Sequence, residues 1–493
     1  MNIKKIYPID WREMHPEGMR ADSDQYFTGI ANRVANILAH SDIDDAFTDS
    51  DELRDAAMRL TAYFEDICTG IGFWKTLNDT CCKRYGKLLP FYDTSDYAPA
   101  EPNVQDVQLL LWDIIQSNDD NRFINPENPG IVFAANDIYG IFDREYETAD
   151  DTPELVDYLH DPAITTDFWQ MRKRLEWIFT RSYINLRGRI DFEGALEEIE
   201  DIRHFEEEAY IHYTHHLFSD RHNLAILTPA EWLSVLSGQR VDIDTSIFYN
   251  RCYEVTAIET ESLRVRDLVN GIELSVENYS FEERWIKKFR LDKSNNKLLM
   301  GLVRWNDKYY QCGSMLEIPS TSLDGILEQV RQRDYKESLM ASNEEQFRKA
   351  SGGESIVFLK GMKQLEEFYA QKMRVPLTGD FLTQMRDTVR ECTEDGMVAL
   401  MGTPDEGILI ITGYVPAIKH KNNPFYDPDY ARKQGQGLLM NPMAVDYSAV
   451  CTMIDQGMLS DIAINSLRGP EYGHMFLQNN IQYVADYSFA EHR

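Results

Sequence analysis

The chain has 493 residues, a mass of 57.3 kDa and a formal charge of −32, from 50 basic and 82 acidic residues. Hydrophobic residues make up 43% of the sequence, which excludes a disordered chain, and the length predicts two to four domains. The net charge is −25 in residues 1–250 and −7 in residues 251–493. Because this acidity repels polyphosphate, we expect no nucleic acid among the partners.

The sequence carries no visible export or membrane signal. No run of 18 apolar residues predicts a transmembrane helix, and Tyr7 to Gly18 contains charged residues and prolines in place of an apolar signal core. The seven cysteines are scattered, with no Cys-x-x-Cys pair, as is typical of reduced core residues. We therefore expect a cytoplasmic protein that does not associate with membranes.

Helical spacing of apolar residues dominates the first half of the chain. Apolar positions that recur every three or four residues predict helices near residues 22–38, 48–67, 103–117, 131–147, 168–184 and 192–218. Thr228-Pro229-Ala230-Glu231 has the pattern of a capping box with proline at the first helical position. A further helix should therefore begin at this motif and end at Gly238.

After Gly238 the apolar residues alternate with polar ones, which is the spacing of β-strands. Strands are predicted at residues 252–259, 262–265 and 272–276, with Asn270-Gly271 as a hairpin turn, and at residues 298–305 and 308–312 around Asn306-Asp307. Four or five short strands can close only a small antiparallel β-barrel-like module. We expect this module to pack against the helical part, because so small a sheet needs cover for its apolar face.

The last third of the chain mixes both patterns. A helix is predicted over residues 322–348, a β-hairpin over 397–400 and 408–412, and a final helical stretch over 459–487. Residues 414–442 are rich in proline and glycine, which predicts a long irregular loop. The predicted fold class is thus α+β, with a helical domain at 1–238, a small β module at 239–320 and a mixed helical domain with a β-hairpin at 321–493.

Several short motifs occur in an order that is familiar from one protein family. They are Lys5-Ile6-Tyr7-Pro8-Ile9-Asp10-Trp11, His15-Pro16, Asp24-Gln25-Tyr26-Phe27, Ala31-Asn32, Leu89-Pro90-Phe91, the Asn103 to Trp112 helix and Asp267-Leu268-Val269-Asn270-Gly271. In these motifs the chain resembles an uncharacterised family of cytoplasmic proteins from Bacteroidales bacteria, a domain of unknown function. The resemblance implies a helical N-terminal region and a cytoplasmic setting, and it supplies no catalytic residues.

One helix face has side chains that could hold a metal ion. Glu208, His212 and His216 recur every four residues, so a carboxylate and two imidazoles could face one ion. The spacing matches neither H-E-x-x-H nor the E-x-x-H motif of di-iron bundles. The alternative interpretation is a solvated or packing face in which glutamate and histidine form weak pairs.

The predicted loop at residues 414–442 contains the one group of basic and aromatic residues in the sequence. Its candidate binding residues are Lys419, His420, Lys421, Tyr426, Arg432 and Lys433. Such a group could bind an anion or a peptide, because long loops in compact domains often carry function. The alternative is an ordinary surface loop without a ligand.

No catalytic motif of high specificity appears in the sequence. We therefore expect an intracellular protein-interaction or regulatory protein without catalytic activity, with another protein as its partner and without a cofactor. The competing hypothesis is a metal-dependent hydrolase that uses the Glu208, His212 and His216 face. The sequence leaves the oligomeric state open.

The charge yields a direct prediction about DNA. At a salt concentration of about 0.15 M we expect no measurable binding to duplex DNA, because too few cations are available to release counterions. Filter binding checks this. A nanomolar dissociation constant that rises steeply with salt would contradict it.

Overall fold

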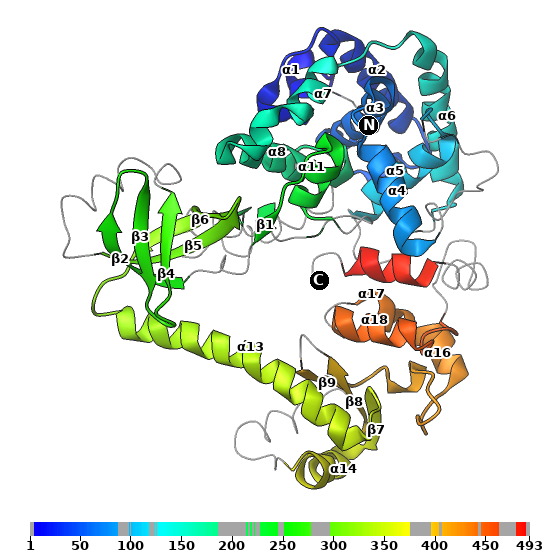
Figure 1. Ribbon diagram of the computed structural model, residues 1–493. Coiled ribbons are helices and arrows are strands. Elements are labelled where there is room, and N and C mark those ends of the chain that lie inside the picture. The colour runs from blue at the N-terminus through cyan, green and yellow to red at the C-terminus, as the bar shows by residue number, and fades with distance from the viewer. Residues whose placement is uncertain are drawn as a thin grey trace. The chain divides into compact units, whose positions relative to one another are not determined.

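The computed structural model describes residues 4–86, 98, 100–117, 124, 126–185, 213–214, 217–218, 221, 227–244, 251–277, 296–374, 396–403, 407–441, 445–462 and 480–489. The chain divides into two compact units, Met1–Val330 and Arg331–Arg493, which we call unit 1 and unit 2 (Figure 1). Helices predominate and the strands form two separate sheets, so the predicted α+β class is confirmed. The division into three domains at 1–238, 239–320 and 321–493 stays a prediction.

The first part of unit 1 is helical, as the apolar spacing predicts. Its helices are α1 (Pro8–Trp11), α2 (Asp24–Leu38), α3 (Ser50–Thr69), α4 (Phe73–Tyr85), α5 (Val104–Ser117), α6 (Pro129–Glu145), α7 (Pro153–His160), α8 (Phe168–Thr180) and α11 (Pro229–Ser237), with short 3₁₀ turns that include η1 (Arg12–Met14) and η2 (Pro16–Gly18). Helix α3 is the central one: it contacts α2, α4 and α5, and it is buried on nearly every side from Leu53 to Asp66. The polar residues on its inward faces therefore need partners inside the protein.

The helix ends follow local sequence signals. The predicted capping box of α11 is present, because Glu231 donates its backbone N–H to the Thr228 hydroxyl at 3.2 Å and accepts from the Thr228 N–H at 2.9 Å. Gly238 ends this helix in the left-handed conformation, with φ of 66°. Asp49 caps α3 in a similar way, and Gly70 ends it with φ of 73°.

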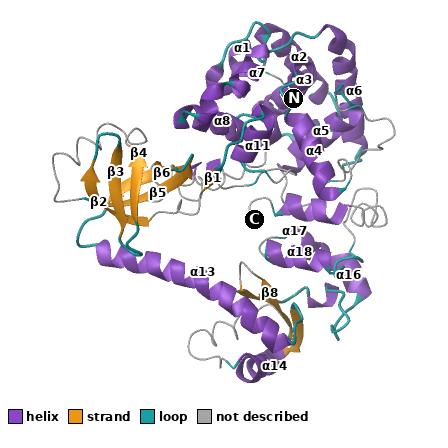
Figure 2. Ribbon diagram, viewed as in Figure 1, coloured by secondary structure: helices purple, strands orange, loops and turns teal. Residues whose placement is uncertain are grey.

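The second part of unit 1 is a small β-barrel (Figure 2). Its strands are β1 (Ile243–Asp244), β2 (Arg251–Ile258), β3 (Ser262–Asp267), β4 (Glu273–Glu277), β5 (Lys297–Trp305) and β6 (Lys308–Glu317). The order β5-β2-β3-β4-β6 closes through β5–β6, and β1 pairs with the end of β5. One pair, β4–β6, is parallel, so the prediction of an antiparallel module is wrong for this pair alone. Five strands in this order form the topology of an OB-fold barrel.

The barrel has its own apolar core and also packs against the helical part. Residues that include Tyr253, Val265 and Leu298 fill its interior. On α8, the Phe168 ring stacks on Tyr310 with 4.2 Å between ring centroids and 2° between planes, and it also contacts Trp305 at 6.0 Å. This contact is the packing against the helical part that the sequence predicts.

Unit 2 is built around a three-stranded antiparallel sheet in the order β7-β8-β9. Its elements include the last turns of α13 (Leu323–Ser351), then β7 (Ile356–Lys360), α14 (Gly361–Glu367), a π-helical turn (Phe368–Met373), β8 (Met397–Thr403), β9 (Gly407–Ile411), α16 (Pro428–Gln434), α17 (Gln436–Met440) and α18 (Tyr447–Asp455). The predicted hairpin is β8–β9, and β7 is a third strand that the pattern missed. Phe347, Leu365 and Leu400 form part of the core.

The prediction of an irregular loop over residues 414–442 is wrong, because the segment contains α16 and α17. Asp427 caps α16 by accepting from two backbone N–H groups, and Pro428 takes the first helical position. Gly435 and Gly437 permit close packing: an added Cβ would lie 2.7 Å from Ile462 Cγ1 and 2.3 Å from the Tyr414 hydroxyl, respectively. The sequence predicts that the prolines and glycines of this segment prevent helices. Instead, Pro428 begins a helix, and the two glycines allow helices to pack closely.

We expect Phe168→Ala to lower the free energy of unfolding by about 3–5 kcal/mol, because it deletes a fully buried ring between α8 and the barrel. Denaturant unfolding measures this change. Phe133→Ala is the matched control, since Phe133 is 65% exposed and should change stability by less than about 0.5 kcal/mol. Equal effects of the two variants would contradict the packing argument.

Candidate functional site

Unit 1 has a cleft of about 500 Å³ between its N-terminal segment and α8, a volume within the range of small-molecule sites. The lining side chains that carry charge are Arg12, Glu13, Glu17, Arg20, Lys173, Glu176 and Arg181, together with the imidazole of His15. Ile9, Trp177 and Tyr213 add apolar and aromatic surface. The cleft therefore combines an apolar surface with many charged groups.

One wall of the cleft is the segment from Arg12 to Met19, which has little regular structure. It consists of the turns η1 and η2, and Glu17 adopts the left-handed conformation with φ of 51°. Two side chains of α8 hold this wall: Trp177 donates its indole N–H to the Met14 carbonyl at 2.9 Å, and Lys173 Nζ lies 2.8 Å from a Glu17 carboxylate oxygen. Side-chain contacts therefore fix the wall.

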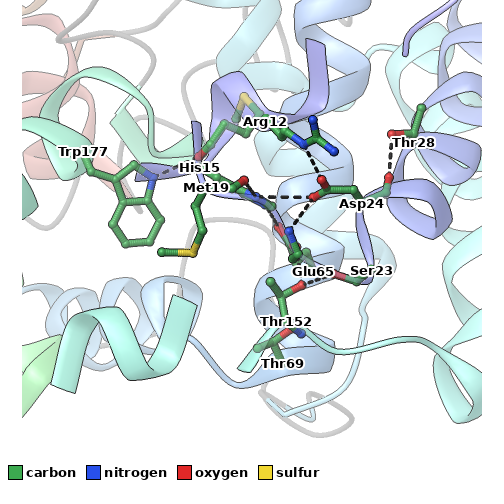
Figure 3. A network of polar contacts seen from close by, with 12 residues as sticks. Arg12, His15, Met19, Ser23, Asp24, Thr28, Glu65, Thr69, Thr152 and Trp177 are labelled. Atoms are coloured by element: carbon green, nitrogen blue, oxygen red, sulfur yellow. Dashed lines mark hydrogen bonds and ion pairs between the residues drawn. The ribbon is translucent and has the colours of Figure 1, made fainter. Parts of the chain in front are cut away.

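His15 belongs to this wall, and its side chain points into the protein, with only 2% of the residue's surface exposed (Figure 3). Its Nε2 is 3.1 Å from Glu65 Oε2, and its Nδ1 is 3.4 Å from the Met19 carbonyl oxygen and 3.9 Å from Asp24 Oδ1. Both ring nitrogens thus face oxygen acceptors, an arrangement that favours the doubly protonated imidazolium.

The two carboxylates that face His15 have further donors. The Thr152 hydroxyl donates to Glu65 Oε1 at 2.6 Å, so the Ser23 hydroxyl, 2.7 Å from Thr152 Oγ1, must donate to Thr152. Arg12 donates its Nε–H to Asp24 Oδ2 at 2.5 Å. We call these six residues the His15 network; their contacts are drawn in Figure 3.

The charges of the His15 network cancel when the imidazole is protonated. Arg12 and His15 then oppose Asp24 and Glu65. Burial lowers the pKa of His15, but the attraction of Glu65 and Asp24 outweighs it, so the pKa lies above its ordinary value of 6.5. The stability that comes from this pairing is therefore fully present below pH 6.5 and is lost as the pH rises through the folded-state pKa.

Two cations at the cleft have no partner in the described part of the chain. Arg12 is paired with Asp24 and Lys173 with Glu17, whereas the exposed Arg20 and Arg181 make no ion pair with any described residue. A guanidinium group presents N–H donors in a planar fork that matches a carboxylate or a phosphate. The cleft can therefore bind an anionic group.

The comparison with protein families identifies the chain. Residues 5–299 and 281–490 match the model of a family described as "Protein of unknown function (DUF3843)". The chain belongs to this family. No curated protein and no solved structure matches this member of DUF3843. The predicted resemblance to an uncharacterised family is thus confirmed, while its Bacteroidales source and cytoplasmic setting stay predictions.

The basic and aromatic residues of the predicted 414–442 loop lie in unit 2, where local carboxylates neutralise most of them. Lys419 Nζ lies 2.7 Å from Asp461 Oδ2, to which the Tyr426 hydroxyl also donates at 2.8 Å. Burial and this hydrogen bond raise the pKa of Tyr426 to about 12, against the nearby charge of Arg432. The structure therefore brings Lys419 and Tyr426 together at Asp461, with Arg432 close enough for its charge to act on Tyr426.

The other basic residues of this group lie around Glu354 or on α16. Lys421 Nζ is 3.3 Å and His420 Nε2 is 3.9 Å from a Glu354 carboxylate oxygen. Arg432 and Lys433 are exposed in the last turn of α16, where positive charge is favourable. The binding role of this group stays a prediction, and the ion pairs leave it less free charge than the sequence suggests.

The predicted metal ligands Glu208, His212 and His216 lie outside the described residues. Among the residues that are described, no group of three His, Cys, Asp or Glu side chains is arranged to hold a metal ion. Within the same ranges, every helix is too short or too polar to span a membrane.

Sequence reasoning did not find the cleft, because its parts are far apart in the chain. His15 and Glu65 are 50 residues apart, and Met14 and Trp177 are 163 apart. One feature of the sequence could have pointed to the cleft, namely the two adjacent acidic residues Glu65 and Asp66. Acidic residues close to the C-terminus of a helix oppose its dipole, so their presence in α3 points to partners elsewhere.

We expect Thr152→Val to destabilise the protein by about 1–3 kcal/mol, because it leaves a buried Glu65 oxygen and the Ser23 hydroxyl without their partner. Chemical denaturation measures the loss. Thr148→Val is the control, since its hydroxyl is exposed and makes only a local bond to the Glu145 carbonyl. A Thr152→Val protein as stable as this control would show that the hydroxyl chain contributes little.

Proposed function

We propose that this chain is an intracellular regulatory or interaction protein without catalytic activity, and that its N-terminal cleft binds a small molecule carrying an anionic group. The proposal is carried by the exposed guanidinium groups of Arg20 and Arg181, which line a cleft of ligand size and make no ion pair with any described residue. Both belong to a half of the chain whose net charge is −25.

The surroundings of the two arginines support an anionic ligand. In so acidic a protein, most cations have a carboxylate within reach, and the cleft's own Arg12 and Lys173 are paired in this way. Arg20 and Arg181 make no such pair within the described part of the chain. A bound carboxylate or phosphate would supply the missing counterion through two-pronged hydrogen bonds.

The rest of the lining supports an apolar or aromatic body for the same ligand. Ile9 at the cleft is 70% exposed, and the rings of Trp177 and Tyr213 also line it. Burial of an apolar group against these side chains would contribute roughly 25 cal/mol for each Å² removed from water. The ligand class is therefore a small molecule with an anionic head and an apolar body.

The chemistry of the described lining favours binding over catalysis. The imidazole of His15 has both nitrogens engaged, Lys173 is held by Glu17, and the Thr180 hydroxyl donates to the Glu176 carbonyl. A covalent mechanism needs a nucleophile beside a free base, and the described lining offers no such pair. A regulatory protein that changes its interactions when the cleft is filled is consistent with this lining.

We expect Arg20→Ala and Arg181→Ala each to weaken benzoate binding about fivefold, the loss expected from one partly solvated ion pair worth about 1 kcal/mol. Ligand-observed NMR titration of the full chain gives the dissociation constants. Phenyl phosphate tests the alternative head group, and benzyl alcohol, which keeps the ring without the charge, should bind less well than benzoate.

Lys75→Ala is the matched control, because Lys75 is also exposed without an ion pair to any described residue but lies on α4 outside the cleft. This variant changes the net charge by the same amount and should bind benzoate as the unaltered protein does. Equal weakening by all three substitutions, or equal affinity for benzyl alcohol and benzoate, would contradict an anion site at Arg20 and Arg181.

A further inference from the structure

We infer that the cleft is regulated by protons: deprotonation of the buried His15 loosens the wall that carries Arg20 and so weakens ligand binding. This inference rests on the proposed function for its second half, the effect on the ligand. Its first half, the loosening of the wall, concerns the free protein and can be tested without any ligand.

The geometry around the imidazole makes the proton necessary. A neutral imidazole has one N–H and one lone pair. If Nε2 keeps the hydrogen for Glu65, the lone pair of Nδ1 faces the Met19 carbonyl oxygen at 3.4 Å; if Nδ1 keeps it, the lone pair of Nε2 faces the Glu65 carboxylate at 3.1 Å. Loss of the proton therefore sets a lone pair against an oxygen in either tautomer.

Both carboxylates that face His15 favour its protonated form. Glu65 on α3 and Asp24 on α2 both favour the imidazolium, and the one nearby cation, Arg12, is bound to Asp24. The indole of Trp11 on α1 meets the imidazole edge-on at 5.7 Å between ring centroids and is uncharged. When His15 loses its proton, Arg12 stays bound to Asp24, and Glu65 loses the one cation that it contacts among the described residues.

Two other titratable groups lie close to Glu65 in the chain, the carboxyl of Asp66 and the thiol of Cys68. Burial, together with Glu65 and Asp66, raises the pKa of the Cys68 thiol to about 12, so the thiol stays neutral. Thr152 contacts the other Glu65 oxygen through its hydroxyl. Burial also raises the pKa of Asp66, against the hydrogen bonds that it accepts from Tyr183 and from the start of α4, so the His15→Gln variant is needed to assign a change near neutral pH to His15.

The proton acts on the cleft through the wall itself. His15 and the Met19 carbonyl are the two ends of the turn Pro16 to Gly18, and Arg20 is the next residue after Met19. The strained backbone at Glu17 depends on contacts at both ends of this turn. Repulsion between His15 Nδ1 and the Met19 carbonyl oxygen would loosen the turn. Arg20, the next residue, would then no longer be held in place.

Hydrogen exchange of the full chain between pH 6 and 9, read by mass spectrometry on peptides covering residues 12–22, tests the first half. After correction for intrinsic exchange, protection should fall by up to about tenfold for each pH unit between pH 6.5 and the folded-state pKa of His15, and should level off above that pKa. Glu65→Gln should move this transition to lower pH, because a neutral amide no longer favours the imidazolium. His15→Gln should abolish it, and His160→Gln, an exposed histidine on α7, should leave it unchanged.

Benzoate tests the second half, because its charge is constant over this pH range. Its affinity for the unaltered protein should fall as the exchange transition proceeds and should not do so for His15→Gln. Absence of the transition, or its persistence in His15→Gln, overturns the inference even if benzoate binds. A transition in the absence of any benzoate binding would support the proton-dependent wall and refute the proposed ligand.

Discussion

The helical part of unit 1 depends on compensation for two adjacent buried carboxylates near the end of α3. Glu65 and Asp66 are each 2% exposed, and an uncompensated charge at such depth costs several kcal/mol. Successive helical residues point about 100° apart, so the two carboxylates face different neighbours. Glu65 accepts from His15 and Thr152, while Asp66 accepts from backbone N–H groups at the start of α4 and from the Tyr183 hydroxyl at 2.6 Å. One turn of α3 therefore positions the N-terminal segment, α4, the start of α7 and the segment after α8.

The cleft is a consequence of this constraint. The segment from Arg12 to Met19 has no helix long enough to hold itself, and isolated short turns are unstable in water. It is ordered because His15 compensates Glu65 from one side and because Trp177 binds the Met14 carbonyl from the other. The folding requirement of a buried charge and the shape of the ligand site thus share the same side chains, and for this reason a single proton can affect both stability and binding.

Local signals explain what the sequence could predict and what it could not. The Thr228 capping box and the Asn270-Gly271 turn act over three or four residues, and both helix and hairpin are present as predicted. The parallel pair at Val276 and Tyr309 closes the barrel across a sequence separation that no turn motif encodes. The His15 network joins residues up to 129 apart, and each of its members alone resembles an ordinary polar residue. Only the charge of Glu65 and Asp66 near a helix C-terminus indicated that long-range partners were required.

The distribution of paired charges separates the cleft from the two other regions that suggested binding. The barrel has the strand order of OB-folds, many of which bind ligands, but a shared topology does not establish a shared function. At the outward positions of β3, Arg264 and Arg266 are held by Glu259 and Glu254, and the exposed positions of β4 offer no aromatic platform for a base. In unit 2, Lys419 is likewise held by a carboxylate. An external anion would first have to displace these carboxylates from Arg264, Arg266 and Lys419. At the cleft, Arg20 and Arg181 make no ion pair with any described residue, so a bound anion would displace none of the described carboxylates from them.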